Sequence, residues 1–509
     1  MRSQYPALYG IFYLSMIIPS CTYTVNSFVR TSRIDDMSPN ELFDWHLREG
    51  AFERLNPPWQ RFKVIERKGN IQNGGTIKVK IKIGGPLHTT WLLKHSDYMK
   101  DQQFRDIQIE GIFKSWTHTH LFKQLGLSSS ELEDNIEYSL PGGKIGRAIA
   151  SDLIDKKLNK MFCYRHRITR EDIQVHSAVN KIRGNNGPMT IAITGSSGFI
   201  GSSLIPFLTT GGHRVIRLIR DPKSPDCEDN NKDLKNIMFI QWNPSSAYAD
   251  VSSLNGNNYN IDAVVNLAGE NIFGKWTNEK KRRIFDSRIN TTKSLCRLLS
   301  LLDKPPKVLV SASATGYYGN RHDEVLTEES SIPSSSSNDF LSDVCMNWEK
   351  STQLAKESGI RVVNLRIGTV LSSSGGILSK ILPAFKLGFG GRIGKGSQYM
   401  SWIGLDDLLA LVLYAVANES IIGPLNAVSP NPITNADFTK TLGKVLSRPT
   451  MFSIPGFIIE KTLGEELSNA VLLSSSRVIP RQLTKLGYKF RFPSLELVIR
   501  HTFGKGISY

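Results

Sequence analysis

Apolar and polar residues follow different patterns in the two halves of the chain. Residues 76–83 carry apolar side chains at every second position, which are Ile77, Val79, Ile81 and Ile83, with lysines between them. This period of two predicts a strand with one apolar and one solvated face. Residues 91–94 and 104–109 predict further strands, and the apolar stripe of residues 146–162 predicts a helix that covers the apolar face. The first half is therefore predicted to be an α+β domain, in which an antiparallel sheet packs against one helix.

This sheet and its single helix predict a site for an apolar ligand. An uninterrupted apolar sheet face offers more surface than one helix can cover, so a cavity can remain between the two. We expect the side chains of Ile77, Val79, Ile81 and Ile83 to line that cavity. A sealed core without a ligand is the alternative.

The second half changes to strands that are followed by helices. Residues 190–193 form a short apolar run, as expected of a strand buried on both faces, and residues 200–208 carry a helical stripe. Between the two lies Thr194-Gly195-Ser196-Ser197-Gly198-Phe199-Ile200-Gly201. Glycines at these places let the backbone turn tightly and approach a pyrophosphate at the amino end of the helix. The segment therefore predicts a dinucleotide-binding turn, with a tight turn that binds nothing as the alternative.

Later segments predict the rest of a doubly wound parallel sheet. They are residues 215–219, 263–267, 308–311 and 362–365. The fold class predicted for this half is α/β of the Rossmann type, whose ligand crevice lies at the carboxyl ends of the strands. We expect Asn266, Ala268 and Gly269 beside the nicotinamide ribose and, near the nicotinamide or the substrate, Ser311, Ser313 and Tyr318.

Two arginines bear on the choice of cofactor. Arg217 lies within the segment 215–219, and Arg220 follows it directly. An acidic residue at this strand end would hydrogen bond the ribose of NAD, whereas an arginine suits the 2′-phosphate of NADP. Arg220 occupies this place, so the sequence predicts NADP in preference to NAD, with Arg220 as the main contact to the phosphate and Arg217 as a second one. The alternative is that Arg220 is only a solvated loop charge.

A short polar cluster at residues 183–188 separates the two patterns and predicts a linker. The predicted domains are residues 22–182, residues 189–450 for the dinucleotide-binding domain, and residues 451–509 for a module that completes a small substrate lobe. Residues 1–21 are not assigned to any of these domains. Their apolar stretch is too short to span a bilayer. A disordered extension, a misassigned start and an export signal that ends near Cys21 are the alternatives for this segment.

His118 and His120 form a possible metal-binding pair, because residues two apart on a strand face the same way. Metal sites usually need three protein ligands, and the sequence offers no nearby acidic or cysteine partner in register. We therefore expect a packed or hydrogen-bonding role for this pair, and the sequence predicts no metal site.

Composition changes this picture little. Hydrophobic residues make up 40% and charged residues 21% of the chain, which argues against a disordered or fibrous protein. The formal net charge of +17 admits nucleic acid or anionic membrane as partners, but the dispersed basic residues favour a solvated basic surface. The cysteines lie far apart without a CxxC pair, which fits a reducing compartment. We therefore expect a cytoplasmic protein without a nucleic-acid partner or a stable membrane span.

Several segments of the second half resemble the extended short-chain dehydrogenase/reductase superfamily, and more closely its atypical epimerase-like branch. They are residues 194–201, 266–271, 287–288, 311–319, 348–349, 366–371, 401–403 and 406–407, with residues 477–495 similar to the short C-terminal module of that branch. The resemblance covers residues 189–503 and implies a Rossmann-type fold that binds NAD(P). The residues expected to bind the cofactor are then Thr194, Gly195, Ser197, Gly198, Phe199, Ile200, Gly201, Arg217, Arg220, Asn266, Ala268, Gly269, Arg288 and Arg366.

The chain departs from that superfamily at its catalytic pair. The superfamily uses a tyrosine and a lysine four residues later, in which the ammonium lowers the pKa of the phenol. The matching places here hold Leu341 and Cys345, and neither can replace its counterpart. We expect any remaining chemistry to use Ser313 with Tyr317 or Tyr318, and to be slow or to need an unusually acidic or preactivated substrate. Aligning the segment from Tyr318-Gly319 instead moves the place of the superfamily's serine to Ala314. In the alternative interpretation both tyrosines only pack.

The first half resembles the START-like (SRPBCC, helix-grip) domains that occur in front of sugar-epimerase-like domains. The residues that carry this likeness are Ser38-Pro39, Leu42-Phe43, Trp45-His46, Gly50-Ala51-Phe52, Arg54-Leu55, Pro57-Pro58-Trp59, Trp116-Thr117-His118-Thr119-His120, Tyr138-Ser139-Leu140-Pro141 and Tyr164-Arg165-His166. The resemblance runs over residues 22–169 and implies the helix-grip fold without naming a ligand.

These patterns support three hypotheses about function. The first is an NADP(H)-binding oxidoreductase or epimerase whose small-molecule substrate the sequence does not identify. The second is a sensor or scaffold that keeps the dinucleotide site without turnover. The third is a carrier of a hydrophobic ligand through the first domain. The sequence does not determine the oligomeric state.

Overall fold

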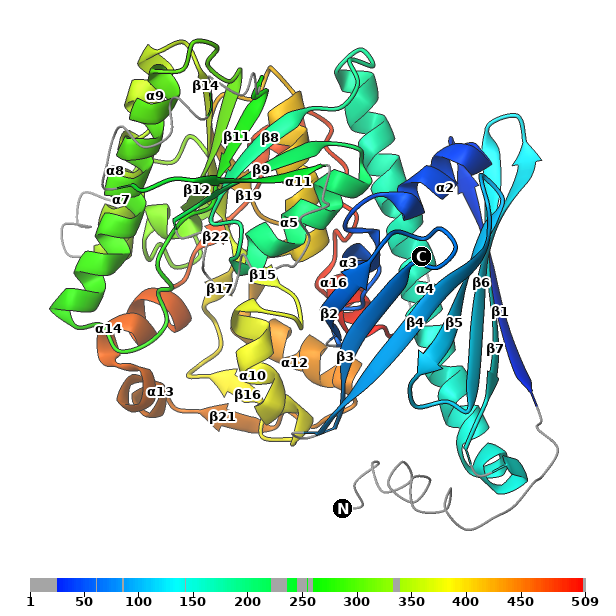
Figure 1. Ribbon diagram of the computed structural model, residues 1–509. Helices are drawn as coiled ribbons and strands as arrows, with labels where there is room; N and C mark the ends of the chain where they lie inside the picture. Colours follow the sequence, from blue (N-terminus) through cyan, green and yellow to red (C-terminus); the bar gives the residue numbers. More distant parts are fainter. Residues whose placement is uncertain are drawn as a thin grey trace. The chain divides into compact units, whose positions relative to one another are not determined.

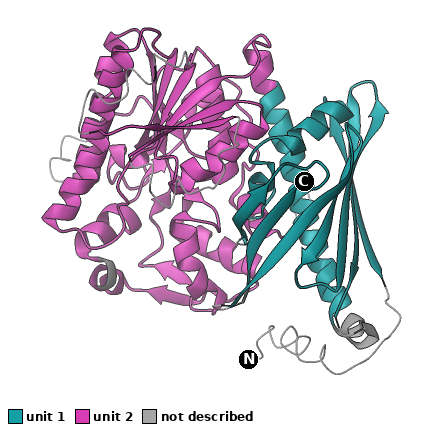
Figure 2. Cartoon of the chain, in the orientation of Figure 1, with its two compact units in different colours: residues 1–177, 229–233 teal, residues 178–228, 234–509 magenta. Residues whose placement is uncertain are grey.

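The computed structural model describes residues 25–60, 62–84, 87–141, 143–220, 236–244, 254, 260–332 and 339–506. They form two compact units, which Figure 2 colours separately. The first unit runs to Ser177 and the second begins at Ala178, so the division falls within helix α4 (Gly143–Ile182), ahead of the predicted linker at residues 183–188. The apolar segment 1–21 lies outside the described residues.

The first unit contains a seven-stranded sheet of order β1-β7-β6-β5-β4-β3-β2, in which every pairing is antiparallel. Its strands are β1 (Asn26–Asp35), β2 (Phe62–Lys68), β3 (Thr76–Gly84), β4 (Leu87–Met99), β5 (Gln103–Glu110), β6 (Ser115–Gly126) and β7 (Ser129–Ser139). The predicted strands at residues 76–83, 91–94 and 104–109 are confirmed as parts of β3, β4 and β5. From β2 to β7, strands that are consecutive in sequence are neighbours in the sheet, whereas β1 pairs with β7 at the other edge.

Three helices pack on this sheet: α2 (Pro39–Leu47), α3 (Ala51–Arg54) and α4. Helix α4 begins at Gly143 and is much longer than the predicted helix at residues 146–162 (Figure 1). Leu158 and Phe162 of α4 share a core cluster with Ile77, Val79 and Ile81 of β3. The apolar face of β3 is therefore buried against the helix, as the alternation indicates. The side chain of Ile83 lies outside the described residues.

The second unit contains a seven-stranded sheet of order β10-β9-β8-β11-β12-β14-β19, and all of its pairings are parallel. The strands are β8 (Thr190–Thr194), β9 (Arg214–Ile219), β10 (Ile237–Gln241), β11 (Ala263–Asn266), β12 (Val308–Ala314), β14 (Arg361–Ile367) and β19 (Gly423–Ala427). The five strands expected from the sequence are confirmed, and the edge strands β10 and β19 were not anticipated. Strand β19 carries a weak apolar signal because it begins with Gly423 and Pro424, whereas the residues 237–240 of β10 are all apolar.

Helices cover both faces of this parallel sheet (Figure 1). They are α5 (Phe199–Thr210), α7 (Asn278–Ser300), α8 (Phe340–Lys350), α9 (Gln353–Glu357) and α11 (Leu405–Ala417). Leu295 and Leu299 of α7 share one core cluster with sheet residues such as Val264 and Leu309. Such burial on both faces explains why the strands read as continuous apolar runs.

The remaining elements form the C-terminal lobe and its connections. They are η1 (Thr315–Tyr318), β13 (Val325–Leu326), β15 (Thr369–Leu371), α10 (Gly376–Lys386), β16 (Gly391–Ile393), β17 (Tyr399–Met400), β18 (Trp402–Gly404), β20 (Ile433–Thr434), α12 (Asn435–Leu446), β21 (Phe452–Ile454), α13 (Gly456–Leu463), α14 (Glu465–Leu467), η3 (Ser468–Leu472), β22 (Arg477–Val478), α15 (Arg481–Lys485) and α16 (Leu495–Phe503). Trp402, Leu442 and Phe492 lie in a separate core cluster of this lobe. The lobe is therefore held together by its own apolar contacts.

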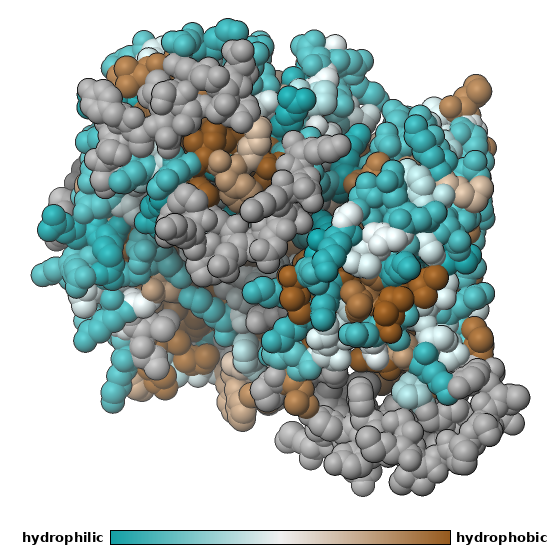
Figure 3. All heavy atoms as spheres, viewed as in Figure 1, coloured by the Kyte–Doolittle hydropathy of each residue, from teal (hydrophilic) through white to brown (hydrophobic). Residues whose placement is uncertain are grey.

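The surface is mixed rather than uniformly polar. On the face seen in Figure 3, brown areas of hydrophobic residues lie between larger areas of hydrophilic ones. Among the helices that the structure describes, none is both long and apolar enough to cross a membrane.

Candidate functional site

The glycine-rich turn between β8 and α5 has the geometry that the sequence predicts. Gly195 has a φ of +64°, and a Cβ there would lie 2.6 Å from the backbone of Leu267. A Cβ at Gly201 would lie 2.4 Å from the carbonyl oxygen of Gly195. The conformation of the turn therefore requires a glycine at position 195. Close packing of the helix on the turn requires one at position 201.

Gly198 differs from these two glycines because it faces outward. A Cβ there would meet only the Gly195 carbonyl oxygen, at 3.2 Å, and both Ser197 and Gly198 are exposed. Gly198 is the N-cap of α5 and has no side-chain cap, so the amides of Phe199, Ile200 and Gly201 open the helix without an intrahelical acceptor. First-turn amides without an intrahelical acceptor suit an anion, and this turn fits the pyrophosphate of a dinucleotide.

The two arginines of the second strand occupy different environments. Arg217 is 7% exposed; its Nε donates to Ser196 Oγ at 3.1 Å, and its guanidinium lies 4.9 Å from the ring centroid of Phe239. Arg220 directly follows β9 and is exposed. The structure therefore brings Arg217 to the glycine turn, whereas Arg220 lies at the carboxyl end of the strand.

Asn266 ties three strands and a helix together at the carboxyl edge of the sheet. Its Oδ1 accepts from Thr194 Oγ1 at 2.7 Å, and its Nδ2 donates to Thr292 Oγ1 at 2.9 Å and to Ser311 Oγ at 3.1 Å. The side chain is fully buried. It therefore acts by fixing the strand ends beside the turn, since its amide is already engaged.

Arg288 of α7 lies under the segment that follows β11. Its Nη1 donates to the carbonyl oxygens of Glu270 and Ile284, at 3.0 and 3.1 Å, and a Cβ at Gly269 would lie 3.2 Å from its guanidinium. The guanidinium also lies 5.1 Å from the Trp348 ring centroid. Arg288 therefore holds the 268–270 backbone in place.

Ser313 and Arg366 meet on one carboxylate. Ser313 Oγ donates to Glu349 Oε1 at 2.8 Å, while Arg366 donates from Nε to Oε1 at 2.8 Å and from Nη2 to Oε2 at 2.9 Å. Both Ser313 and Arg366 are 3% exposed. The only hydroxyl proton of Ser313 is thus directed at Glu349, and Arg366 is held in a buried, bidentate ion pair.

The two tyrosines of η1 differ in whether their hydroxyl groups bond other side chains. Tyr318 is fully buried; its hydroxyl donates to Asn426 Oδ1 at 2.7 Å and receives a hydrogen bond from Arg366 Nη1 at 2.9 Å. The pKa of Tyr318 is raised to about 12, and burial of the hydroxyl is the largest cause of this shift. The Tyr317 ring stacks 3.5 Å from the Arg366 guanidinium, and its hydroxyl makes no hydrogen bond with a described residue. Tyr317 is therefore the better placed of the two to meet a substrate.

Helix α8 carries Leu341 and Cys345, the residues predicted to stand in place of the superfamily's tyrosine and lysine. A Cβ at Gly316 would lie 3.5 Å from Leu341 Cβ and 3.7 Å from Cys345 Sγ, so both side chains face η1. Burial raises the pKa of the Cys345 thiol to about 12, which keeps it neutral. Neither side chain can therefore perform the proton chemistry of a tyrosine and a lysine.

Three residues that bond the predicted site residues were not predicted from the sequence: Thr292, Glu349 and Asn426. Glu349 belongs to the segment 348–349 that resembles the superfamily, but its role becomes clear only from its contacts. Thr292 and Asn426 lie far along the chain from their partners Asn266 and Tyr318. No local pattern marks such residues, because the pairing depends on which strands and helices become neighbours.

Taken together, the parallel sheet and its outward-facing glycine turn define a dinucleotide-binding α/β protein. Residues 191–426 match the NAD dependent epimerase/dehydratase family, and residues 454–502 match a domain of unknown function, DUF1731. An epimerase family protein of Mycobacterium leprae is 37% identical over 320 residues, which are 63% of this chain and 94% of that protein. The chain belongs to the NAD dependent epimerase/dehydratase family.

Solved structures extend the comparison. The nucleoside-diphosphate sugar epimerase from Corynebacterium glutamicum is 31% identical, with a TM-score of 0.73 over 94% of this chain and 90% of that one. Its coverage shows that the likeness includes the antiparallel first unit. The human epimerase family protein SDR39U1, solved with NADPH, is 30% identical, with a TM-score of 0.53 over 62% of this chain and 99% of that one.

Proposed function

We propose that the second unit binds NADP(H) and acts as an oxidoreductase or epimerase on a small molecule. The observation that carries this proposal is the exposed turn at Ser197 and Gly198, which offers first-turn amides of α5 to an anion. Arg217, bonded to the same turn, supports a phosphate on the adenosine ribose, because a guanidinium presents a planar fork of donors. A related human protein solved with NADPH points the same way.

The chain's own residues limit the chemistry that a bound nicotinamide could perform. When bound, the cofactor supplies or accepts a hydride. Asn266 and Arg288 would hold the backbone that borders it, and Tyr317 could donate a hydrogen bond to a substrate oxygen. Ser313 can contribute its hydroxyl proton only by releasing Glu349. We therefore expect slow turnover, because matched acid–base help worth about 10²- to 10⁴-fold is missing.

Binding and turnover can be tested separately. The purified chain is titrated with NADPH and NADH, and hydride transfer from NADPH to a panel of carbonyl and enone compounds is followed. Tighter binding of NADPH, with slow transfer to some of the panel, supports the proposal. Equal affinity for the two cofactors, or binding of neither, contradicts it.

A sensor or scaffold is the second candidate, and one observation favours it. Every polar group expected to move a proton is absent or engaged, apart from Tyr317: Leu341 and Cys345 replace the catalytic pair, and Tyr318 is buried between two partners. Tight NADPH binding without turnover on any compound tested would establish this second candidate over the first.

We further propose that the first unit is a START-like, helix-grip domain that takes up an apolar molecule. Its support is the antiparallel sheet on which α4 packs through Leu158 and Phe162. Ile77, Val79 and Ile81 are buried in the same cluster, so the ligand would have to enter among residues that already pack together. Uptake of a fluorescent apolar probe by the full chain, reduced in Val79→Asp relative to Lys80→Asp, tests this proposal. No uptake by the parent protein overturns it.

A further inference from the structure

A cluster of histidines and carboxylates lies in the first unit, away from the glycine turn in sequence. Asp106 of β5 is directly opposite His118 of β6, and His120 follows two residues later on the same face. The two histidines are 4% and 7% exposed. The expectation that the pair lacks an acidic partner in register is therefore wrong, because strand pairing supplies Asp106.

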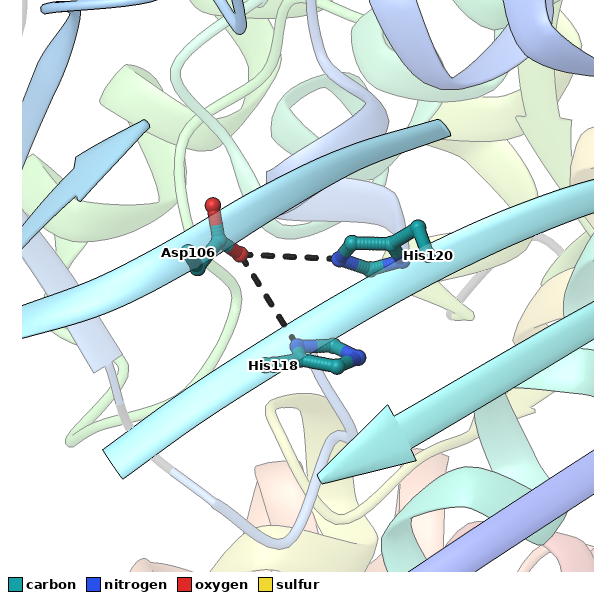
Figure 4. A group of neighbouring side chains, drawn as sticks. All are labelled: Asp106, His118 and His120. Atoms are coloured by element: carbon teal, nitrogen blue, oxygen red, sulfur yellow. Dashed lines mark ion pairs between the residues drawn. The ribbon is translucent and has the colours of Figure 1, made fainter. Parts of the chain in front are cut away.

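The three side chains point at one another, as Figure 4 shows. Asp106 Oδ2 lies 3.5 Å from His120 Nε2 and 3.8 Å from His118 Nδ1. All three ligand atoms lie within 4.8 Å of one another. These separations are long for hydrogen bonds, but they are close to the edge of about 3.4 Å expected between tetrahedral ligands with metal bonds of about 2.1 Å.

Each of the three side chains has a second polar atom, which lies close to a charged or titratable side chain outside the group. His118 Nε2 is 2.8 Å from Asp134 Oδ1, and Asp106 Oδ1 is 2.6 Å from His95 Nδ1. His120 Nδ1 is 2.7 Å from the same Asp134 oxygen. Metal-binding histidines usually present their second nitrogen to a carboxylate in this way, which fixes the ring orientation. Asp134 is in turn anchored by His166 Nε2 of α4, 2.6 Å from its Oδ2.

His120 lies between two carboxylates. Its Nδ1 is 2.7 Å from Asp134 Oδ1, and its Nε2 forms the long 3.5 Å ion pair with Asp106 Oδ2 that Figure 4 marks. A metal ion bound to this nitrogen and to this carboxylate would replace the long contact with two short bonds. The alternative occupant is a proton on His120, held between the two carboxylates.

We propose that Asp106, His118 and His120 bind one divalent transition-metal ion, with Asp134 and His95 as the outer partners that orient them. Two imidazoles and one carboxylate form a ligand set used by zinc and by non-haem iron(II) sites, both of which leave a position open for water or a ligand. No thiol takes part.

The first test uses the full-length parent protein. After treatment with a chelator, it is titrated with Co²⁺ and Zn²⁺, and metal content is measured by mass spectrometry. We expect one metal ion per chain and a rise in the melting temperature with metal concentration. X-ray absorption of the zinc-loaded protein should show nitrogen and oxygen ligands at about 2.0–2.2 Å. A sulfur shell at about 2.3 Å, or no metal uptake, overturns the proposal.

Variants assign the site. Asp106→Asn keeps the shape of the side chain, and His120→Gln keeps an amide near the place of the ring; both should lose metal binding by at least tenfold. Asp134→Asn should bind about 10- to 100-fold more weakly, as expected for an outer partner. His88→Gln, on the exposed part of β4, is the matched control and should bind like the parent. Parent-like affinity in Asp106→Asn and His120→Gln, with a native circular dichroism spectrum, would place the metal elsewhere and refute the site.

Discussion

Arg217 Nε donates a hydrogen bond to Ser196 Oγ at 3.1 Å, so the second strand of the parallel sheet is tied to the glycine turn. Two residues that are separate in sequence thereby share the place where a cofactor phosphate is expected. Arg220, by contrast, lies exposed past the end of that strand.

This contrast predicts different effects of replacing the two arginines. Arg217→Ala should weaken NADPH binding by about 1.5–3 kcal/mol, or about 10- to 150-fold in Kd, if its guanidinium bonds the 2′-phosphate. Arg220→Ala should change the Kd less, because an exposed charge is screened. Fluorescence titration of both variants with NADPH and NADH measures the difference. A larger loss in Arg220→Ala would assign the phosphate to the strand end instead.

Substitutions at two glycines of the turn should affect different properties, one the stability of the fold and the other the binding of NADPH. Gly201→Ala places a Cβ 2.4 Å from the Gly195 carbonyl oxygen, so the free energy of unfolding should fall by about 1–3 kcal/mol. Gly198→Ala meets only one atom, at 3.2 Å, and should keep stability while it weakens NADPH binding. Denaturant unfolding and cofactor titration of the two variants check this. Equal loss of stability in both would contradict the outward orientation of Gly198.

The tyrosines of η1 should behave differently when their hydroxyls are removed. Tyr318→Phe removes the buried hydroxyl that Asn426 Oδ1 and Arg366 Nη1 both bond, so we expect a loss of about 1–3 kcal/mol in stability. Tyr317→Phe should change stability by less than about 0.5 kcal/mol but should slow any hydride transfer. Thermal unfolding and single-turnover kinetics provide the two measurements. Unchanged transfer in Tyr317→Phe would remove it as a catalytic candidate.

Breaking a buried ion pair of the first unit should cost more stability than breaking an exposed one. Arg54 binds Asp172 through two hydrogen bonds of 2.6 and 2.9 Å, and both side chains are almost fully buried. Asp172→Ala leaves a buried charge without its carboxylate and should cost about 3–5 kcal/mol. Asp35→Ala breaks the exposed pair with Arg33 and should cost at most about 1 kcal/mol. Comparable losses in the two variants, measured by urea unfolding, would refute this difference.

Cysteine reactivity should depend on burial and on pH. Burial raises the pKa of Cys296 and of Cys345 to about 12, above the ordinary thiol value of about 8.5. Both thiols should therefore resist alkylation in the native protein at neutral pH, while the partly exposed Cys163 reacts. Because the folded state holds these protons more tightly, stability should fall as the pH rises from about 8.5 toward 12. Peptide mass spectrometry after brief labelling gives the reactivity of each site, and early labelling of Cys345 would contradict its burial.

The sequence by itself determined the elements whose signal is local. The alternation of residues 76–83 identified β3, because side chains of a strand point to opposite faces. The apolar run before Gly195 and the stripe after it identified β8, the turn and α5, since the glycines act through backbone geometry that involves nearby atoms. The sequence also shows directly that the second half contains no tyrosine followed by a lysine four residues later.

Only the tertiary structure decided which side chains meet. Asp106 stands opposite His118 because two strands pair in one particular register, and a shift by one residue would separate them. Tyr318 finds Asn426, and Ser313 finds Glu349, through contacts between distant segments. Such pairs produce no periodic pattern in the sequence. Each polar residue meets its partner only when the sheets and helices assemble.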